Sequence, residues 1–301
     1  MTVNDASIDA RDWSLLGLLS ILWGGSFFFN GVVLKEFPPF TLVFLRVALA
    51  SLMLLPLLWL YRIRFPAGLS GWGPFIAIGL FNNVLPFSLI VVGQTYIPSG
   101  LASILNATTP LFTVAVMAAA GEEKLLARRI AGVVVGLIGV IILHGDGIGL
   151  ERGQGLGILL CLAAALSYGV SALAARRLLS DSPPLGAATF QMLASTAMMT
   201  IIAGLVERPW LLPMPGATTW FAVLGLAALS TALAYIVFFQ ILRRSGATNV
   251  MLVTLLIPVT AILLGVLVLG EKISAREIAG ALVIGSALLL IDGRVLKFFQ
   301  R

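Results

Sequence analysis

Long apolar runs separated by short polar segments make up almost the whole chain. The charged side chains gather in the separating segments, and none occurs between Phe65 and Gly121, a stretch that accommodates two bilayer-crossing helices of about 20 residues each. The pattern predicts an all-α integral membrane protein with ten transmembrane helices. The predicted spans are residues 13–34, 40–60, 73–93, 98–120, 128–144, 154–175, 185–205, 217–240, 247–270 and 275–296.

The second half of the chain repeats the first. The segment PLFTVAVMAAAGEEKLLARRIAGVVVGLIGVIILHG at 110–145 recurs without a gap as PVTAILLGVLVLGEKISAREIAGALVIGSALLLIDG at 258–293, an offset of 148. Upstream, the segment WGGS at 23–26 is matched by YGVS at 168–171, an offset of 145. Ten helices in two copies leave five per copy, and an odd number places the copies in opposite orientations. We therefore expect two inverted five-helix repeats, residues 1–149 and 150–301.

Composition agrees with a membrane protein, since 59% of the residues are hydrophobic and 11% are charged, against about 25% charged residues in soluble domains. The net charge of +6 would suit nucleic acid, but the basic residues punctuate apolar segments, so we expect membrane lipid and no nucleic acid as partner. The acidic N-terminus lacks the basic region of a secretory signal, so the first run is expected to remain as a span. Cys161 is expected to be a packing residue.

The basic residues also predict the orientation. With a cytoplasmic N-terminus, thirteen of them fall in cytoplasmic segments and five in outer segments, a bias that places both termini in the cytoplasm. The thirteen are Arg11, Arg62, Arg64, Lys124, Arg128, Arg129, Arg176, Arg177, Arg243, Arg244, Arg294, Lys297 and Arg301, and the five are Lys35, Arg152, Arg208, Lys272 and Arg276.

Three motifs resemble the ten-helix EamA branch of the drug/metabolite transporter superfamily. They are LWGGSFFFNGVVLKEFPPFTLVFLRVALASLMLL, the hairpin TTP…GEEK…AGVVVGLIGV and its partner LIP…GEK…IAGALVIGSALLL. Within that branch the chain is most similar to bacterial amino-acid exporters of the YddG type. The resemblance implies a bacterial inner (plasma) membrane protein with a central cavity, lined by helices 1–4 and 6–9, and with helices 5 and 10 standing apart.

The fifth and tenth predicted spans are both short. Gly132 and Gly136 form a GxxxG face on the fifth, which favours close helix packing, either within a monomer or across a homodimer. On the tenth, the segment from Ser274 to Glu277 predicts a capping box at the start of the helix.

Polar and aromatic side chains near mid-span mark the candidate substrate site, because a polar group in hydrocarbon must find a partner or line a cavity. Each of them also has an ordinary structural reading, as packing, interface anchor or helix bridge. On the third span, Pro86 is expected to free a backbone carbonyl at Asn82. The candidate substrate-binding residues are Trp23, Ser26, Asn30, Arg46, Asn82, Asn83, Asn106, Tyr168, Ser171 and Gln191.

Charged groups narrow the substrate class. Arg46 lies well inside a span, where both a structural anchor and carboxylate recognition are open, and its counterpart in the second repeat is Gln191. All thirteen acidic residues fall in tails, loops or span ends, so the mid-membrane carboxylate typical of proton-coupled exporters of cationic drugs is missing. His144, the single histidine, lies at a span end. Sugar nucleotides would call for several embedded basic residues.

These observations predict a secondary transporter that exports small neutral or zwitterionic metabolites, foremost aromatic and other apolar amino acids, by alternating access as a uniporter. The alternatives are a multidrug exporter of organic compounds and, in a different class, a non-transporting membrane scaffold. Sodium bound at carbonyls freed by Pro86, Pro110 or Pro258 would give ion coupling instead. The sequence shows no catalytic or metal-ligand constellation, so no enzyme activity, cofactor or metal site is expected.

Overall fold

The computed structural model describes residues 10–122, 127–144, 153–180, 182–250 and 253–292, and every regular element within these ranges is a helix. The helices are α1 (Ala10–Val33), α2 (Pro39–Leu60), α3 (Gly68–Gly79), η1 (Leu80–Val84), α4 (Leu85–Gly93), α5 (Ser99–Asn106), α6 (Thr109–Ala119), α7 (Ala127–His144), α8 (Gln154–Leu178), α9 (Pro184–Val206), η2 (Pro209–Leu211), α10 (Ala217–Ala227), η3 (Ala228–Leu233), α11 (Ala234–Val250), α12 (Val253–Leu269) and α13 (Ala275–Asp292). The all-α prediction is confirmed.

Seven spans in the described part of the chain are long and apolar enough to cross a membrane, and shorter apolar helices cover Ile130–Ile142 and Leu256–Leu269. Three of the predicted spans are composite. The third consists of α3, η1 and α4, the fourth of α5 and α6, and the eighth of α10, η3 and α11. Most predicted ends agree with the helix ends to within a few residues.

The predicted junction between the eighth and ninth spans, residues 241–246, is wrong. α11 continues through it to Val250. At the equivalent junction of the first repeat, Pro98 precedes Ser99, the first residue of α5, and proline cannot continue a preceding helix. At an offset of 148 the second repeat has Gly246 in place of Pro98. Since no proline interrupts the backbone hydrogen bonds there, the helix runs on.

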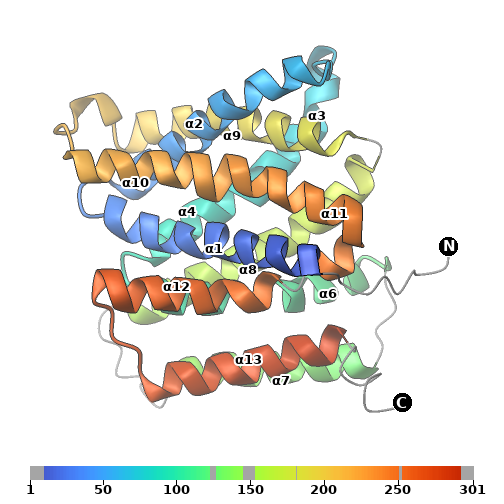
Figure 1. Cartoon of the computed structure of the whole chain (residues 1–301), viewed down its shortest axis with the longest axis vertical. Helices are drawn as coiled ribbons and strands as arrows, with labels where there is room; N and C mark the ends of the chain where they lie inside the picture. The colour runs from blue at the N-terminus through green and yellow to red at the C-terminus, as the bar shows by residue number, and fades with distance from the viewer. Residues whose placement is uncertain (1–9, 123–126, 145–152, 181, 251–252, 293–301) are drawn as a thin grey trace.

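Helices of one half of the chain pack against helices of the other half. α1 packs against α12, α10 and α11, and its counterpart α8 packs against α6, α5 and α4. α2 packs against α9, and α7 against α13, so these two pairs join equivalent helices. Figure 1 shows α7 and α13 together at one side of the molecule, where α7 also packs on α6. The fold is two inverted five-helix repeats, with the fifth and tenth spans forming a separate pair.

Small residues bring α7 close to its neighbours. A Cβ at Gly139 would lie 2.8 Å from Cγ1 of Ile284 and 3.1 Å from the carbonyl oxygen of Gly280, both on α13. Gly136 faces the side chain of Leu111 on α6. This part of the small-residue face therefore packs within the monomer. On α13 the capping box is confirmed, since Ser274 N donates to Glu277 Oε2 (2.7 Å) and Glu277 N donates to Ser274 Oγ (3.1 Å).

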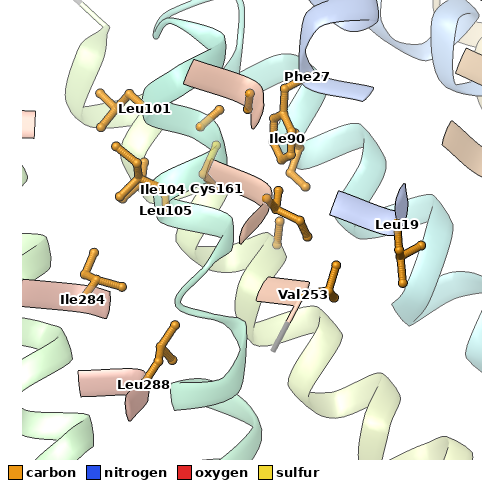
Figure 2. Packing of buried hydrophobic residues seen from close by; sticks show 14 of the residues in the cluster. Leu19, Phe27, Ile90, Leu101, Ile104, Leu105, Cys161, Val253, Ile284 and Leu288 are labelled. Atoms are coloured by element: carbon orange, nitrogen blue, oxygen red, sulfur yellow. The ribbon is translucent and has the colours of Figure 1, made fainter. Parts of the chain in front are cut away.

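Cys161 lies in the apolar core between α4, α5 and α8 (Figure 2). Its thiol is free and its side chain is completely buried, as expected of a packing residue. A Cβ at Gly93 would lie 2.9 Å from the Cys161 sulfur and 3.1 Å from the carbonyl oxygen of Gly157. Glycine at position 93 thus allows the backbones of α4 and α8 to approach closely.

Candidate functional site

The third and eighth spans each contain a widened π-helical turn at the same place. The turns are Leu80–Val84 and Ala228–Leu233, and their starts differ by the repeat offset of 148. Pro86 follows the first turn, as the sequence led us to expect, but Ala234 takes its place after the second. A following proline therefore does not explain both π-helical turns. Such turns occur frequently at functional sites, because they reorient side chains and leave backbone groups unpaired.

Side-chain hydroxyl groups donate hydrogen bonds to backbone carbonyl oxygens around both turns. At the first turn, Ser167 Oγ donates to the carbonyl oxygen of Phe81 (2.8 Å). Ser195 Oγ lies 3.2 Å from the carbonyl oxygen of Gly79, the last residue before the turn, and 2.6 Å from that of Gln191 in its own helix. In the second, Thr231 Oγ1 donates to the carbonyl oxygen of Leu226 (2.9 Å). The serines come from α9 and α8, so the second repeat helps to stabilise the turn of the first.

Five side chains from three helices form a partly buried hydrogen-bonded network, here called the amide cluster: Asn82, Asn83, Gln191, Ser195 and Tyr235. Asn82 Nδ2 donates to Gln191 Oε1 (3.1 Å) and to Tyr235 Oη (3.1 Å). Asn83 Nδ2 donates to Ser195 Oγ (3.0 Å), and Tyr235 Oη donates to Asn83 Oδ1 (3.3 Å). The network therefore connects η1 of the first repeat to α9 and α11 of the second.

Arg46 lies beside this cluster with 6% of its surface exposed. Its Nε donates to Thr231 Oγ1 (3.1 Å), the one hydrogen bond that the guanidinium makes within the described residues. The guanidinium carbon lies 3.7 Å from the ring centroid of Phe87, a cation–π contact. The phenols of Tyr168 and Tyr235 are close enough to interact with it electrostatically. Within those same residues, no carboxylate forms an ion pair with Arg46.

The three candidates on α1 have other partners. Asn30 Nδ2 donates to Gln94 Oε1 (2.8 Å), and Gln94 Nε2 donates to Ser99 Oγ (3.1 Å). Ser26 Oγ donates to the carbonyl oxygen of Trp23 (2.6 Å), whose ring packs on Phe238 with a centroid distance of 5.6 Å. The face that the sequence predicts on α1 therefore divides between a polar network at one end of the helix and an aromatic contact in its middle.

Of the ten predicted residues, the structure places Asn82, Asn83 and Gln191 in the amide cluster and Arg46 and Tyr168 next to it. Asn106 ends α5, where the fourth span breaks, and its Oδ1 is buried without a hydrogen-bond partner. Ser171 is buried on α8. Trp23, Ser26, Asn30, Asn106 and Ser171 make no hydrogen bond to the amide cluster within the described residues.

Tyr235 was missed among the candidates, although the repeat contains the signal. At the 148 offset it corresponds to Phe87, and Arg46 corresponds to Gln191 at the 145 offset. Phe87 lies against Arg46. In the other half, the Asn82 amide donates hydrogen bonds to both Tyr235 and Gln191. The two halves thus build related environments, one around a cation and one around a neutral amide.

A cavity of about 1140 Å³ opens between α2, α3, α9 and α11 at the end of the molecule that contains Arg62, here called the Arg62 end. Arg62 and Arg64 are exposed in its wall. Phe190 and Phe239 also line it, and Phe239 stacks on Tyr235 with a centroid distance of 6.1 Å. The cavity therefore reaches the neighbourhood of the amide cluster from this end.

At the opposite end, here called the Glu36 end, glutamates of one half bind helix starts of the other. Glu207 accepts hydrogen bonds from Phe40 N (2.9 Å), Thr41 N (2.6 Å) and Thr41 Oγ1 (2.7 Å), all at the start of α2. Glu271 accepts from Ser99 N (2.9 Å) and Gly100 N (3.2 Å) at the start of α5. Helix starts leave N–H groups unpaired and favour negative charge, so these carboxylates hold the two halves together.

Glu36 makes the third contact of this kind. It accepts from Gly216 N (2.8 Å) before α10, and bonds from Thr219 and Gly216 lower the pKa of the Glu36 carboxyl below its ordinary value. The residues that precede α2, α5 and α10 are Pro38, Pro98 and Gly216, which have no side-chain acceptor with which to cap their own helices. The opposite half supplies the missing acceptors.

In the part of the Arg62 end that the structure describes, the Glu207 contact has no counterpart. Glu207 follows α9 and Tyr61 follows α2, and the next residues, Arg208 and Arg62, both have positive φ, 51° and 53°. Tyr61 therefore occupies the position of Glu207, but it carries no carboxylate. Described contacts between the halves at this end include exposed ion pairs such as Arg177 Nε to Glu122 Oε1 (2.8 Å), and pairs of that type contribute little.

Inverted repeats, π-helical turns in mid-span and a cavity open at one end define a polytopic membrane transporter. The model of the EamA-like transporter family matches residues 12–144 and 155–292, so the chain belongs to this family.

Relatives extend over nearly the whole chain. A "Probable amino-acid metabolite efflux pump" of Salmonella typhimurium is 28% identical over 93% of this chain and 94% of its own length. An "Uncharacterized inner membrane transporter" of Escherichia coli is 27% identical over 91% of this chain and 88% of its own. A crystal structure 21% identical in sequence matches with a TM-score of 0.66 over 95% of this chain and 98% of that one, which supports the fold alone.

Proposed function

We propose that this protein exports amino acids, foremost aromatic and other apolar ones, from the bacterial cytoplasm by alternating access. The observation that carries the proposal is Arg46, a buried cation without a carboxylate partner in the described structure, set beside neutral amide and phenol groups. A buried charge without a partner is costly, so a ligand with a carboxylate is favoured there. Two relatives, in Salmonella typhimurium and Escherichia coli, are named as probable amino-acid metabolite efflux pumps, which supports the same substrate class.

In this proposal Arg46 binds the substrate carboxylate. Asn82, Gln191 and Tyr235 supply hydrogen bonds to the remaining polar atoms, and the Tyr168 ring contacts the apolar side chain. The other predicted residues, Trp23, Ser26, Asn30, Asn106 and Ser171, remain predictions for the substrate pathway. In this proposal the cavity that receives the substrate lies at the interface of the two repeats. The repeats are assigned to residues 1–149 and 150–301.

The proposed orientation places the Arg62 end in the cytoplasm, where short loops of membrane proteins carry excess Lys and Arg. Arg62, Arg64, Arg176 and Arg177 all lie at this end. Both termini are then cytoplasmic, and the cavity opens toward the cytoplasmic solute. The relative named as an inner membrane transporter supports the same membrane.

A multidrug exporter of cations is less well supported, because the described spans carry Arg46 rather than a carboxylate near the amide cluster. Uniport is also a simpler mechanism than sodium-coupled transport. The carbonyl oxygens of Leu105 and Asn106, at the break before Pro110, accept bonds from the hydroxyls of Thr108 (2.6 Å) and Thr109 (2.7 Å). These carbonyls are thus partly occupied before any ion arrives.

Solute flux into proteoliposomes tests the proposal. Labelled phenylalanine and threonine are compared with a cationic drug, with and without imposed proton and sodium gradients, and liposomes without protein provide the background. We expect amino acids to enter until internal and external concentrations are equal. Flux of the drug alone contradicts the substrate class, accumulation driven by either ion contradicts uniport, and absence of all flux supports the scaffold alternative.

A further inference from the structure

The two repeats make the same kind of contact between halves, but only one of the two contacts is charged. Arg46 on α2 bonds Thr231 in η3, and Gln191 on α9, its equivalent, bonds Asn82 in η1. The two bonded partners, Asn82 and Thr231, are not equivalent positions. At the 148 offset Asn82 corresponds to Ser230 and Asn83 to Thr231, so the partners differ by one position in the aligned repeats. The site therefore holds one positive charge that the internal symmetry does not balance.

This charge is poorly compensated when no ligand is bound. The Arg46 guanidinium has one hydrogen bond and one aromatic face in the described structure, and it is 6% exposed. The other N–H groups of the guanidinium make no hydrogen bond in the described structure. They are complementary to a carboxylate, which accepts hydrogen bonds with both oxygens.

The missing compensation matters most during reorientation. An alternating-access carrier passes through a state in which its site is closed to water on both sides. In the empty carrier Arg46 then has neither water nor an anion, whereas in the loaded carrier the substrate carboxylate is its partner. Since an unpaired charge in a low-dielectric environment is strongly unfavourable, the empty carrier faces the higher barrier.

We propose that Arg46 makes fast reorientation conditional on a bound carboxylate, so that the protein exchanges carboxylate-bearing solutes across the membrane faster than it moves them in one direction. The inference rests on the proposed function and goes beyond it by naming the group that the carrier requires. The net direction still follows the solute gradient, because exchange adds no energy source.

The experiment uses proteoliposomes loaded with labelled phenylalanine in sulfate buffer, so that no halide is present as a substitute anion. Efflux is measured into buffer alone, into unlabelled phenylalanine, and into phenylalaninamide, which lacks the carboxylate. We expect external phenylalanine to accelerate efflux about tenfold, equivalent to ~1.4 kcal/mol of barrier, and the amide to leave the rate unchanged. Equal efflux into buffer and into phenylalanine overturns the inference, and so does equal acceleration by the acid and the amide.

Variants identify the group responsible. Arg46→Gln, which introduces the residue of the equivalent position, is expected to bring the ratio of exchange to net efflux close to one, and Arg46→Lys is expected to keep the ratio high. Arg177→Gln removes an exposed arginine that pairs with Glu122 and should leave the ratio unchanged. A high ratio in Arg46→Gln overturns the inference.

The comparison of acid and amide is made on the unaltered protein, so it tests the inference even if transport by Arg46→Gln is too slow to measure. No efflux from unaltered protein contradicts the proposed function instead.

Discussion

Replacing Glu207 with glutamine should loosen the Glu36 end of the molecule. The two carboxylate oxygens accept three hydrogen bonds from the start of α2, at 2.6 to 2.9 Å. Glutamine keeps one acceptor oxygen, so either Phe40 N or the two Thr41 donors lose their partner, and the negative charge at the helix start is lost as well. A hydrogen bond to a charged group contributes ~1.5–3 kcal/mol and the helix-dipole interaction ~0.3–1 kcal/mol. Because Glu207 is partly exposed, we discount the total to ~1–2 kcal/mol.

That free energy corresponds to an increase of about 5- to 30-fold in the population open at the Glu36 end. The assay follows labelling of Leu45→Cys with a polar maleimide in nanodiscs, in a Cys161→Ala background, since Leu45 lines a small cavity of about 180 Å³ at this end. Nanodiscs expose both faces, so the result does not depend on the orientation in the membrane. The labelling rate should rise in Glu207→Gln, by at most that factor because Leu45 is already partly exposed.

The matched control is Glu277→Gln. Glu277 also binds a helix-start N–H, but within its own repeat, through Ser274 N. Its replacement should lower thermal stability without altering the labelling of position 45. Unchanged labelling in Glu207→Gln, or an equal rise in both variants, would show that the glutamate contacts between halves do not hold this end closed.

Three further predictions concern the site and the same end. Tyr235→Phe removes a hydroxyl that bonds both amides of η1, and should raise KM for phenylalanine several-fold with the melting temperature within a degree or so; an unchanged KM places the substrate elsewhere. Trp23→Ala and Tyr168→Ala should reduce transport with little loss of stability, and a fall of several degrees in Tm with a proportionate fall in flux would identify them as core residues. The Glu36 contact depends on the ionised carboxylate, whose pKa is lowered, so it is present above the ordinary carboxyl value of 4.5 and is lost as pH falls through the lowered pKa. Labelling of position 45, divided by the labelling rate of a free thiol at the same pH, should therefore increase at acid pH, and Glu36→Gln should make that increase smaller.

Much of the architecture follows from patterns that are local in sequence. Apolar run length, the 148-residue offset and the Ser274 to Glu277 box all concern residues that lie close together or recur in register, so helices, repeats and the cap were predictable. The prediction for the junction before α12 is wrong because the basic pair Arg243-Arg244 was taken to separate two apolar runs. The decisive signal was the presence of Pro98 in one repeat and Gly246 in the other.

The site was only partly predictable, because its contacts join residues far apart in the chain. Asn82 and Gln191 are separated by 109 positions, and Arg46 and Thr231 by 185. Position along a span indicates depth and face but not the partner, so Asn30 was grouped with Arg46, although its amide bonds Gln94. The π-helical turns have no simple sequence signal, since proline follows one of them and alanine the other.

Binding of phenylalanine to purified protein tests the central claim, that a carboxylate solute binds at Arg46. Calorimetry compares unaltered protein with Arg46→Gln, and the melting temperature of each reports whether the fold is intact. Loss of one partner of a buried charge pair costs at least ~2 kcal/mol, so we predict that affinity for phenylalanine falls by about 30-fold or more while affinity for phenylalaninamide changes little. Equal affinity of both proteins for phenylalanine, with both folds intact, would contradict the account.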